Sequence, residues 1–321
     1  MLETLLLWIL PSIAILAGFG GLIWSADRFV DGSAAIASRL GASKLVIGLT
    51  VVAFGTSAPE AIVSISSSLS GAGDLAVGNA IGSNLANIGL VLGITALIAP
   101  LPIKAHILQQ EYVIMMGIMA LAGGFLWDGV LQFWEGIVLM SSLLPLLAWI
   151  AHSKKQHPGE EEDNHELTIK TGLFWFLVGL TALIVSAEIL VWGAKATASY
   201  FGVSPLVIGL TVVAVGTSLP ELAASVASAL KGHHDIAIGN VIGSNMFNIL
   251  LVMGIAPAIA PLSLGSEVFS RDFLAMVGIT LVLGIAMLVS YLRSDGGHGQ
   301  LNRRIGVVLL LLYVAYYTLL F

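Results

Sequence analysis

Apolar residues run along this chain in long segments, and the polar residues between them fall into short groups. Ten of these segments have the length that a helix needs to cross a hydrocarbon core about 30 Å thick. They cover residues 4–31, 44–70, 75–99, 107–126, 130–151, 170–198, 205–230, 236–260, 269–291 and 303–321. The pattern predicts an all-α polytopic membrane protein with ten transmembrane helices.

The second half of the chain repeats the first at a constant offset. Residues 46–60 read VIGLTVVAFGTSAPE, and residues 207–221 read VIGLTVVAVGTSLPE. Further on, DLAVGNAIGSN at 74–84 returns as DIAIGNVIGSN at 235–245. Agreement over these lengths marks an internal duplication.

Two five-helix repeats joined by a polar linker account for the chain. The repeats cover 1–151 and 171–321, the linker covers 152–170, and the duplicated motif covers 44–99 and 205–260. Because each repeat has an odd number of spans, the second is expected to enter the membrane upside down relative to the first. Helices 2 and 7 contain Gly/Pro sequences, helices 3 and 8 contain Gly-Asn and Gly-Ser-Asn, and all four are expected to be broken there.

Composition agrees with this assignment and narrows the classes of partner. Of the 321 residues, 57% are hydrophobic and 10% are charged, and the mean hydropathy is +0.98. These values are typical of polytopic membrane proteins. The absence of cysteine excludes disulfides and thiolate metal sites. No segment resembles a nucleic-acid-binding module, so the lipid bilayer is the expected partner and no protein partner is required.

The distribution of Lys and Arg predicts the orientation in the membrane. With the N-terminus outside, eleven of the 13 basic residues fall on the inner side, and only Lys195 and Arg271 fall on the outer side. Positive charge favours the cytoplasmic side. Both termini are therefore expected outside, and the 152–170 linker with its acidic run at 160–163 is expected in the cytoplasm of a bacterial or archaeal cell.

The second predicted helix contains a single charged residue in its apolar run, Glu60. A carboxylate in a membrane-length segment is costly unless a cation or a polar partner meets it. Thr56 and Ser57 precede Glu60 by four and three residues, so on a helix the three share a face. Pro59, with Gly55 four residues before it, is expected to open the helix and leave backbone carbonyls without their helical hydrogen bonds. Hydroxyls, carbonyls and a carboxylate form an all-oxygen set suited to Na⁺ or Ca²⁺.

The second half repeats this set of residues. In each half, the helix that follows the set also carries a stripe of polar residues. The stripes are Asn79, Ser83 and Asn87 in the first half and Asn240, Ser244 and Asn248 in the second. Residues four apart roughly share one helix face, and we expect these stripes to ligate ions. Asn84 and Asn245 point elsewhere and are expected to join helices.

An inverted repeat would bring both copies to a pseudo-two-fold axis near mid-membrane. Glu60 and Glu221 would then face each other. Two like carboxylates in a low dielectric cannot both stay ionised without a cation. One Ca²⁺ or two Na⁺ would neutralise them, and this mutually exclusive occupancy is a natural basis for exchange.

The two copies of GTS-x-PE followed by GN-x-x-GSN-x-x-N resemble the α-repeats of the sodium/calcium exchangers, in the calcium/cation antiporter superfamily. The similarity covers most of the chain and is closest to bacterial single-chain members without a cytosolic regulatory domain. It implies a secondary antiporter of Na⁺ and Ca²⁺ that is not an enzyme and needs no cofactor. It also implies three Na⁺ per Ca²⁺, with the first and sixth helices sliding across a core bundle to alternate access.

The resemblance further implies which residues bind the transported ions, with Glu60 and Glu221 as the central ligands. Further oxygens would come from the side chains of Thr56, Ser57, Ser83, Thr217, Ser218 and Ser244 and from the backbone carbonyls of Ala53 and Ala214. Several relatives carry Asp where this chain has Asn87 or Asn248. The site is therefore expected to contain only two acids, which argues against K⁺ co-transport.

Other functions fit the sequence less well. Ca²⁺/H⁺ exchange is the alternative within the same superfamily, because paired carboxylates also carry protons, but the hydroxyl-rich GTS steps suit Na⁺ better. An ion channel favours rings of parallel subunits over two inverted halves in one chain. An intramembrane hydrolase needs a His-Glu-x-x-His zinc site or a Ser/Lys or Asp/Asp pair, and none is present in the sequence.

Overall fold

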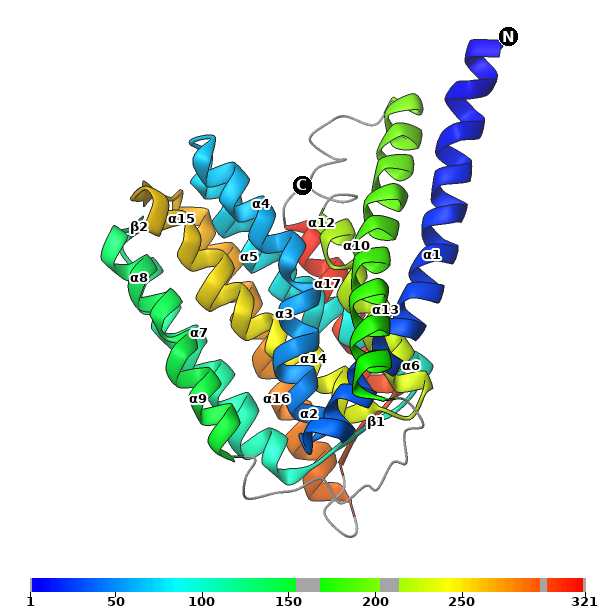
Figure 1. Cartoon of the computed structure of the whole chain (residues 1–321). Helices are drawn as coiled ribbons and strands as arrows, with labels where there is room; N and C mark the ends of the chain where they lie inside the picture. The colour runs from blue at the N-terminus through cyan, green and yellow to red at the C-terminus, as the bar shows by residue number, and fades with distance from the viewer. Residues whose placement is uncertain (1, 154–167, 203–213, 295–298, 320–321) are drawn as a thin grey trace.

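The computed structural model describes residues 2–153, 168–202, 214–294 and 299–319, which form a helical bundle with two short β-ribbons (Figure 1). The acidic run at 160–163 and the repeated stretch at 207–213 lie outside the described residues.

The α-helices are α1 (Leu2–Leu40), α2 (Lys44–Ile47), α3 (Ala53–Thr56), α4 (Ala58–Leu69), α5 (Gly73–Ala86), α6 (Gly93–Ile98), α7 (Tyr112–Leu126), α8 (Phe133–Ser141), α9 (Leu143–Ser153), α10 (Ile169–Tyr200), α12 (Ala214–Thr217), α13 (Leu219–Leu230), α14 (His234–Phe247), α15 (Gly254–Ile259), α16 (Leu274–Arg293) and α17 (Arg303–Thr318). Wider π-helical turns form η1 (Gly48–Val52), η2 (Asn87–Leu92), η3 (Ile107–Glu111), η5 (Asn248–Met253) and η6 (Val268–Phe273). The strands are β1 (Leu101–Ile103), β2 (Val130–Leu131), β3 (Leu262–Ser263) and β4 (Gly299–Leu301).

Seven helices of the described part are long and apolar enough to cross a membrane, or eight if the bent pair Lys44–Thr56 and Ala58–Leu69 counts as one span. The chain is therefore an integral membrane protein whose spanning segments are helical. The seventh predicted segment is described only from Ala214 onward, and the tenth is the 16-residue helix α17. The division into ten spans stays a prediction.

The predicted break in the second helix is present. α3 ends at Thr56, α4 begins at Ala58, and the two parts of this span are bent by 42°. The predicted breaks at the Gly-Asn and Gly-Ser-Asn sequences of the third and eighth helices are wrong, because α5 and α14 run through them without interruption. The regular α-helix gives way to π-helical turns only at Asn87 and Asn248.

Close packing explains the glycines of α14. A Cβ atom added at Gly239 would lie 2.8 Å from the Leu45 carbonyl oxygen, and one added at Gly243 would lie 2.6 Å from the Leu49 carbonyl oxygen. These glycines let α14 touch the backbone of the second span, which a larger side chain would prevent. They therefore position the two elements that carry the site.

Two other helix boundaries differ from the prediction. α1 continues to Leu40 instead of ending near residue 31, because residues 33–37 are buried and several of them pack in a hydrophobic cluster. Asp27 and Asp31 lie inside the helix and pair with Lys231 at 2.7 and 2.5 Å. The fifth predicted helix is interrupted at Ser142 between α8 and α9. The Ser142 hydroxyl donates to the Val138 carbonyl at 2.7 Å, a type of bond that often bends helices.

Each β-ribbon joins the loop after the motif of one half to a different loop of the other half, and the two ribbons are equivalent to each other. β1 pairs antiparallel with β4, in the register Leu101↔Leu301, and β2 pairs antiparallel with β3, in the register Val130↔Ser263. β1 and β3 both follow the motif region, since each comes directly after the helix, α6 or α15, that ends it. Figure 1 shows β1 and β2 at opposite ends of the bundle. This placement is the one that an inverted repeat would produce.

α1 and α10 lie side by side along their length (Figure 1) and are joined through glycines. A Cβ atom added at Gly18 would lie 2.7 Å from the Cβ of Leu190, and one added at Gly179 would lie 2.5 Å from the Phe29 nitrogen. Such contacts make the two helices one packing unit. This unit rests on α13 through α1.

Candidate functional site

Each half presents its hydroxyls and its glutamate at a kink between two short helices. α3 and α4 meet at Ser57, and α12 and α13 meet at Ser218. The two serines have nearly the same backbone angles, φ −82° and ψ 5° in the first and φ −88° and ψ 4° in the second. Glu60 and Glu221 lie in the first turns of α4 and α13, where the helix dipole favours negative charge.

The two glutamates are fully buried, and each contacts a hydroxyl of the other half. Ser57 Oγ donates to Glu221 Oε1 over 3.2 Å, and Thr217 forms a side-chain hydrogen bond with Glu60. Ser83 Oγ also donates to Glu60 Oε1 over 3.4 Å. The carboxylates lie close enough for their charges to repel each other. The site is therefore built across the junction of the halves.

The second oxygen of each carboxylate is left without a partner. Glu60 Oε2 and Glu221 Oε2 are buried and make no hydrogen bond within the described part of the chain. Buried charges in proteins are normally paired or coordinate a metal ion. Two such oxygens among hydroxyls therefore point to a cation rather than to a structural hydrogen bond.

Thr56 connects the first kink to the polar stripe of α14. Its Oγ1 donates to Asn240 Oδ1 over 3.1 Å and lies 3.4 Å from Ser244 Oγ. The Ala53 carbonyl accepts from the Ser57 nitrogen at 3.0 Å and lies 3.3 Å from Thr56 Oγ1. The predicted site residues form two hydrogen-bonded groups, which the repulsion between the Glu60 and Glu221 carboxylates places next to each other and which together make the buried network. One group is Ala53, Thr56, Ser57, Glu221, Asn240 and Ser244, and the other is Glu60, Ser83 and Thr217.

Other predicted residues are buried near the network without a hydrogen bond to it. Asn87 and Asn248 open η2 and η5, and neither amide atom of either side chain has a partner in the described residues. Ser218 Oγ is likewise buried and unpartnered there. The side chain of Ala214 is outside what the structure describes. π-Helical turns such as η2 and η5 are frequent at functional sites.

Two serines of this region were not predicted. Ser64 Oγ donates to the Val252 carbonyl in η5 at 2.6 Å, and Ser225 Oγ accepts from Asn240 Nδ2 at 2.9 Å. Each serine follows its glutamate by four residues, so the helical spacing could have found both. The expectation for Asn84 is confirmed, because its Nδ2 donates to the Asn245 carbonyl at 3.2 Å and joins the helices.

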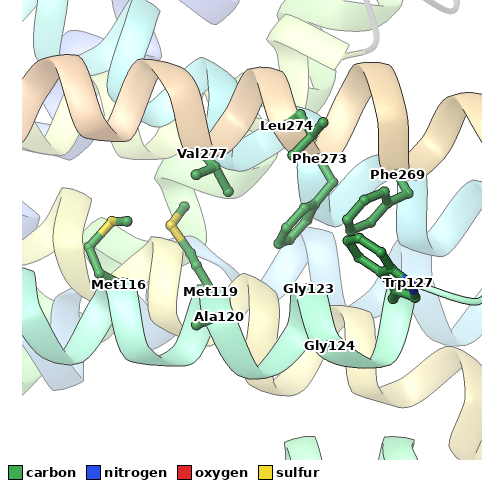
Figure 2. A pocket seen from close by; sticks show the side chains of 10 residues that line it. All are labelled: Met116, Met119, Ala120, Gly123, Gly124, Trp127, Phe269, Phe273, Leu274 and Val277. Carbon is green, nitrogen blue, oxygen red and sulfur yellow. The ribbon is translucent and has the colours of Figure 1, made fainter.

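An apolar groove of about 380 Å³ lies between α7 and the η6–α16 segment, apart from this network. Figure 2 shows its wall side chains: Met116, Met119, Ala120, Gly123, Gly124, Trp127, Phe269, Phe273, Leu274 and Val277. Trp127 and Phe269 meet edge to face with ring centroids 5.4 Å apart. A cation finds no carboxylate, hydroxyl or amide side chain in this groove, so the buried network is the candidate site.

Known proteins resemble the chain over nearly its whole length. The family model described as "Sodium/calcium exchanger protein" matches residues 11–150 and 171–321. The chain is 42% identical to the putative antiporter CaxA of Alkalimonas amylolytica, over 98% of this chain and 99% of that protein. It is 31% identical to the sodium/calcium exchanger MaX1 of Methanosarcina acetivorans, over 96% and 98%. A solved structure of the sodium-calcium exchanger NCX_Mj, soaked with Na⁺ and Sr²⁺, matches with a TM-score of 0.82 and 32% identity, covering 97% of this chain and 98% of that one.

Proposed function

The chain belongs to the sodium/calcium exchanger family, and we propose that it is a secondary antiporter that exchanges Na⁺ for Ca²⁺ across a bacterial or archaeal inner membrane. Membership of the family supports cation antiport involving Ca²⁺. One observation carries the finer proposal: two fully buried glutamates, one from each half, meet among hydroxyls from both halves.

The transported ions bind between the two kinks, with Glu60 and Glu221 as the charged ligands. The neutral oxygen donors are Ala53, Thr56, Ser57, Ser83, Asn87, Ala214, Thr217, Ser218, Ser244 and Asn248. The unpartnered oxygens of Glu60, Glu221, Asn87 and Asn248 support this assignment. Carboxylate, hydroxyl, carbonyl and amide oxygens are the ligands that hard cations prefer.

The charge of the site is the reason why Ca²⁺ and Na⁺ exchange there. Two carboxylates in a low dielectric are neutralised by one Ca²⁺ or by two Na⁺. Ca²⁺ and Na⁺ therefore exclude each other, and each leaves when the other takes its place. The site has more oxygen donors than two Na⁺ can use, which leaves donors for a third. Exchange of three Na⁺ for one Ca²⁺ moves one net charge and is therefore electrogenic.

The architecture that serves this cycle is two inverted five-helix repeats, 1–151 and 171–321, joined by a cytoplasmic linker at 152–170. The equivalent β-ribbons at opposite ends of the bundle support the inversion. So do η2 and η5, which begin 161 residues apart, at Asn87 and Asn248. Both termini face the outside in this topology, and ten spans cross the membrane.

The α1–α10 unit alternates access by moving as one body. In the described state it covers α13 through α1, and α4 exposes an apolar face that includes Ile62 and Ile65. In the opposite state the unit covers α4 and uncovers α13. Relative movement of packed repeats about a fixed central site is the common route to alternating access.

Ca²⁺ uptake into liposomes tests the proposed function. Reconstituted protein in Na⁺-loaded liposomes, diluted into Na⁺-free buffer with labelled Ca²⁺ and the pH gradient collapsed, should take up Ca²⁺. Liposomes loaded with choline should not. An inside-positive potential should speed uptake, because net positive charge leaves with Na⁺ and each charge gains about 2.3 kcal/mol per 100 mV. Uptake driven by a pH gradient without Na⁺ would favour the Ca²⁺/H⁺ alternative.

A further inference from the structure

Asn240 of α14 links the kink of the first half to the glutamate helix of the second. Its side chain is fully buried. Its Oδ1 accepts from Thr56 Oγ1 at 3.1 Å. Its Nδ2 donates to Ser225 Oγ at 2.9 Å and to the Glu221 backbone carbonyl at 3.3 Å. One amide therefore bonds to two other helices, α3 and α13.

These partners determine which way the Asn240 amide points. The backbone carbonyl oxygen of Glu221 only accepts hydrogen bonds, so the amide atom that faces it has to be Nδ2. The Oδ1 atom then faces Thr56. Oδ1 also only accepts, so a proton has to lie between it and the Thr56 hydroxyl. The Ala53 carbonyl is a second acceptor for Thr56, but it is 3.3 Å away and already accepts from the Ser57 nitrogen. The shorter contact therefore assigns the single Thr56 proton to Asn240.

The direction of the Thr56 proton determines whether the hydroxyl presents a lone pair or a proton to an ion. Thr56 also lies within hydrogen-bonding reach of the Glu221 carboxylate, and an ionised carboxylate is a stronger acceptor than an amide oxygen. Without Asn240 the acceptors left in reach are the Ala53 carbonyl and the Glu221 carboxylate, and the ionised carboxylate is the stronger of the two. The hydroxyl would then satisfy part of the charge meant for the cation and would turn its proton toward the ion position.

We propose that Asn240 is a positioning residue for ion binding: it takes the Thr56 proton, so that the Thr56 oxygen and the Glu221 carboxylate present lone pairs to the same cation. The Asn240 bond to the Glu221 backbone also sets the spacing of these two donors, which come from different halves. The inference rests on the proposed function and adds to it a residue outside the ligand set. It departs from the sequence expectation that Asn240 binds an ion directly, because both ends of its amide are already hydrogen-bonded.

The equivalent residue of the first half, Asn79 of α5, does not form the same bridge. Its side chain is half-buried, and its Nδ2 finds no acceptor within the described residues. Asn240 is fully buried, and its Nδ2 donates to both Ser225 and Glu221. The two halves therefore differ at this repeat position.

Ca²⁺ binding to the purified protein, measured by titration calorimetry in Na⁺-free detergent solution, tests this role. Asn240→Ala should weaken Ca²⁺ binding about tenfold, the effect of one hydrogen bond in a charged site. Ser225→Ala removes one anchor of the amide without touching Thr56 and should weaken binding about threefold. The matched control is Asn245→Ala, because Asn245 is equally buried on α14 and its side chain has no hydrogen-bond partner in the described part. Its dissociation constant should stay within about twofold of the wild-type value.

A double-mutant cycle separates positioning from general support of the fold. Thr56→Val removes the hydroxyl on which Asn240 acts, so adding Asn240→Ala should weaken binding by no more than about a further twofold. Fully additive losses, or Asn240→Ala and Ser225→Ala with wild-type affinity, would overturn the inference and leave the proposed function standing. If the wild-type protein bound no Ca²⁺, the proposed function would fail first and this inference with it.

Discussion

α4 and α13 are equivalent helices of 12 residues each, yet their surroundings differ. On α4, Ile62 and Val63 are 63% and 38% exposed. On α13, Ala224 stands at the position of Val63 and is 0% exposed, because it packs in the cluster that contains α1. The two copies of the motif therefore place their glutamates alike, but α13 is covered by α1 and α4 is exposed.

The internal packing of the α1–α10 unit does not share this asymmetry. Gly18 of α1 abuts Leu190 of α10, and the equivalent Gly179 of α10 abuts Phe29, the equivalent of Leu190, on α1. A unit whose two sides are alike has nonetheless docked on one half. The difference between the halves therefore lies in the position of the unit, which supports a reversible movement between two docking sites.

Two differences in sequence favour the docking site on α13. α13 offers the small residues Ala223 and Ala224, where α4 has Ile62 and Val63, and both alanines pack in the cluster that contains residues of α1. Lys231, at the end of α13, pairs with Asp27 and Asp31 of α1, whereas the position equivalent to Lys231 in the first half is Ser70. The duplication has thus kept the glutamates and hydroxyls of the candidate site and changed the face of the helix that carries each glutamate.

The largest expected effect is the same in both halves. Glu60→Gln and Glu221→Gln each remove one of the two charges that a Ca²⁺ needs, from a fully buried site. Either change should lower Na⁺-driven Ca²⁺ uptake at least about a hundredfold, as expected for breaking a buried charge interaction. Gel filtration in detergent checks that both variants stay folded. A variant that transports at near the wild-type rate would show that its half does not contribute a ligand.

The second effect concerns the covered half. Ala224→Val places the first-half residue in the buried contact with α1, where overpacking costs about 1–3 kcal/mol. The populations of the two states should shift about tenfold away from the described one. The chain has no native cysteine, so spin labels at Trp24→Cys and Leu230→Cys can report the distance between α1 and α13.

Val63→Ala is the reciprocal variant, because it gives the exposed face of α4 the small residue that α13 has. It should shift the populations in the same direction as Ala224→Val, by a smaller factor because Ile62 remains on α4. If Val63→Ala shifted the populations toward the described state, side-chain size on the docking face would not set the preference.

A smaller effect concerns the ion pairs of Lys231. Its side chain is 25% exposed, and those of Asp27 and Asp31 are 47% and 33% exposed, so solvent screens both pairs. Lys231→Ser should therefore shift the same distance distribution only about threefold. Raising the ionic strength should shift the wild-type protein in the same direction and the variant much less. Equal salt dependence in both proteins would exclude these pairs as a cause of the docking preference.

The duplication explains why the central residues could be predicted. Glu60 and Glu221 stand out as single charges in repeated apolar runs, and Pro59 beside Gly55 marks the bend that the structure has at Ser57. The connections that sequence reasoning missed depend on contacts between distant segments. Gly239 and Gly243 serve packing against the second span, and α1 continues past residue 31 because residues 33–37 pack in the core. Thr56 and Asn240 are 184 residues apart, so their hydrogen bond required the fold.

In the proposed mechanism, Ca²⁺ and Na⁺ displace each other from one site shared by the two halves. This displacement is measured by calorimetric titration of the wild-type protein with Ca²⁺ at increasing Na⁺ concentration and constant ionic strength. The apparent Ca²⁺ dissociation constant should rise steadily and more steeply than in proportion to Na⁺, since at least two Na⁺ replace one Ca²⁺. A Ca²⁺ affinity that does not change with Na⁺ would show that the two ions do not share a site.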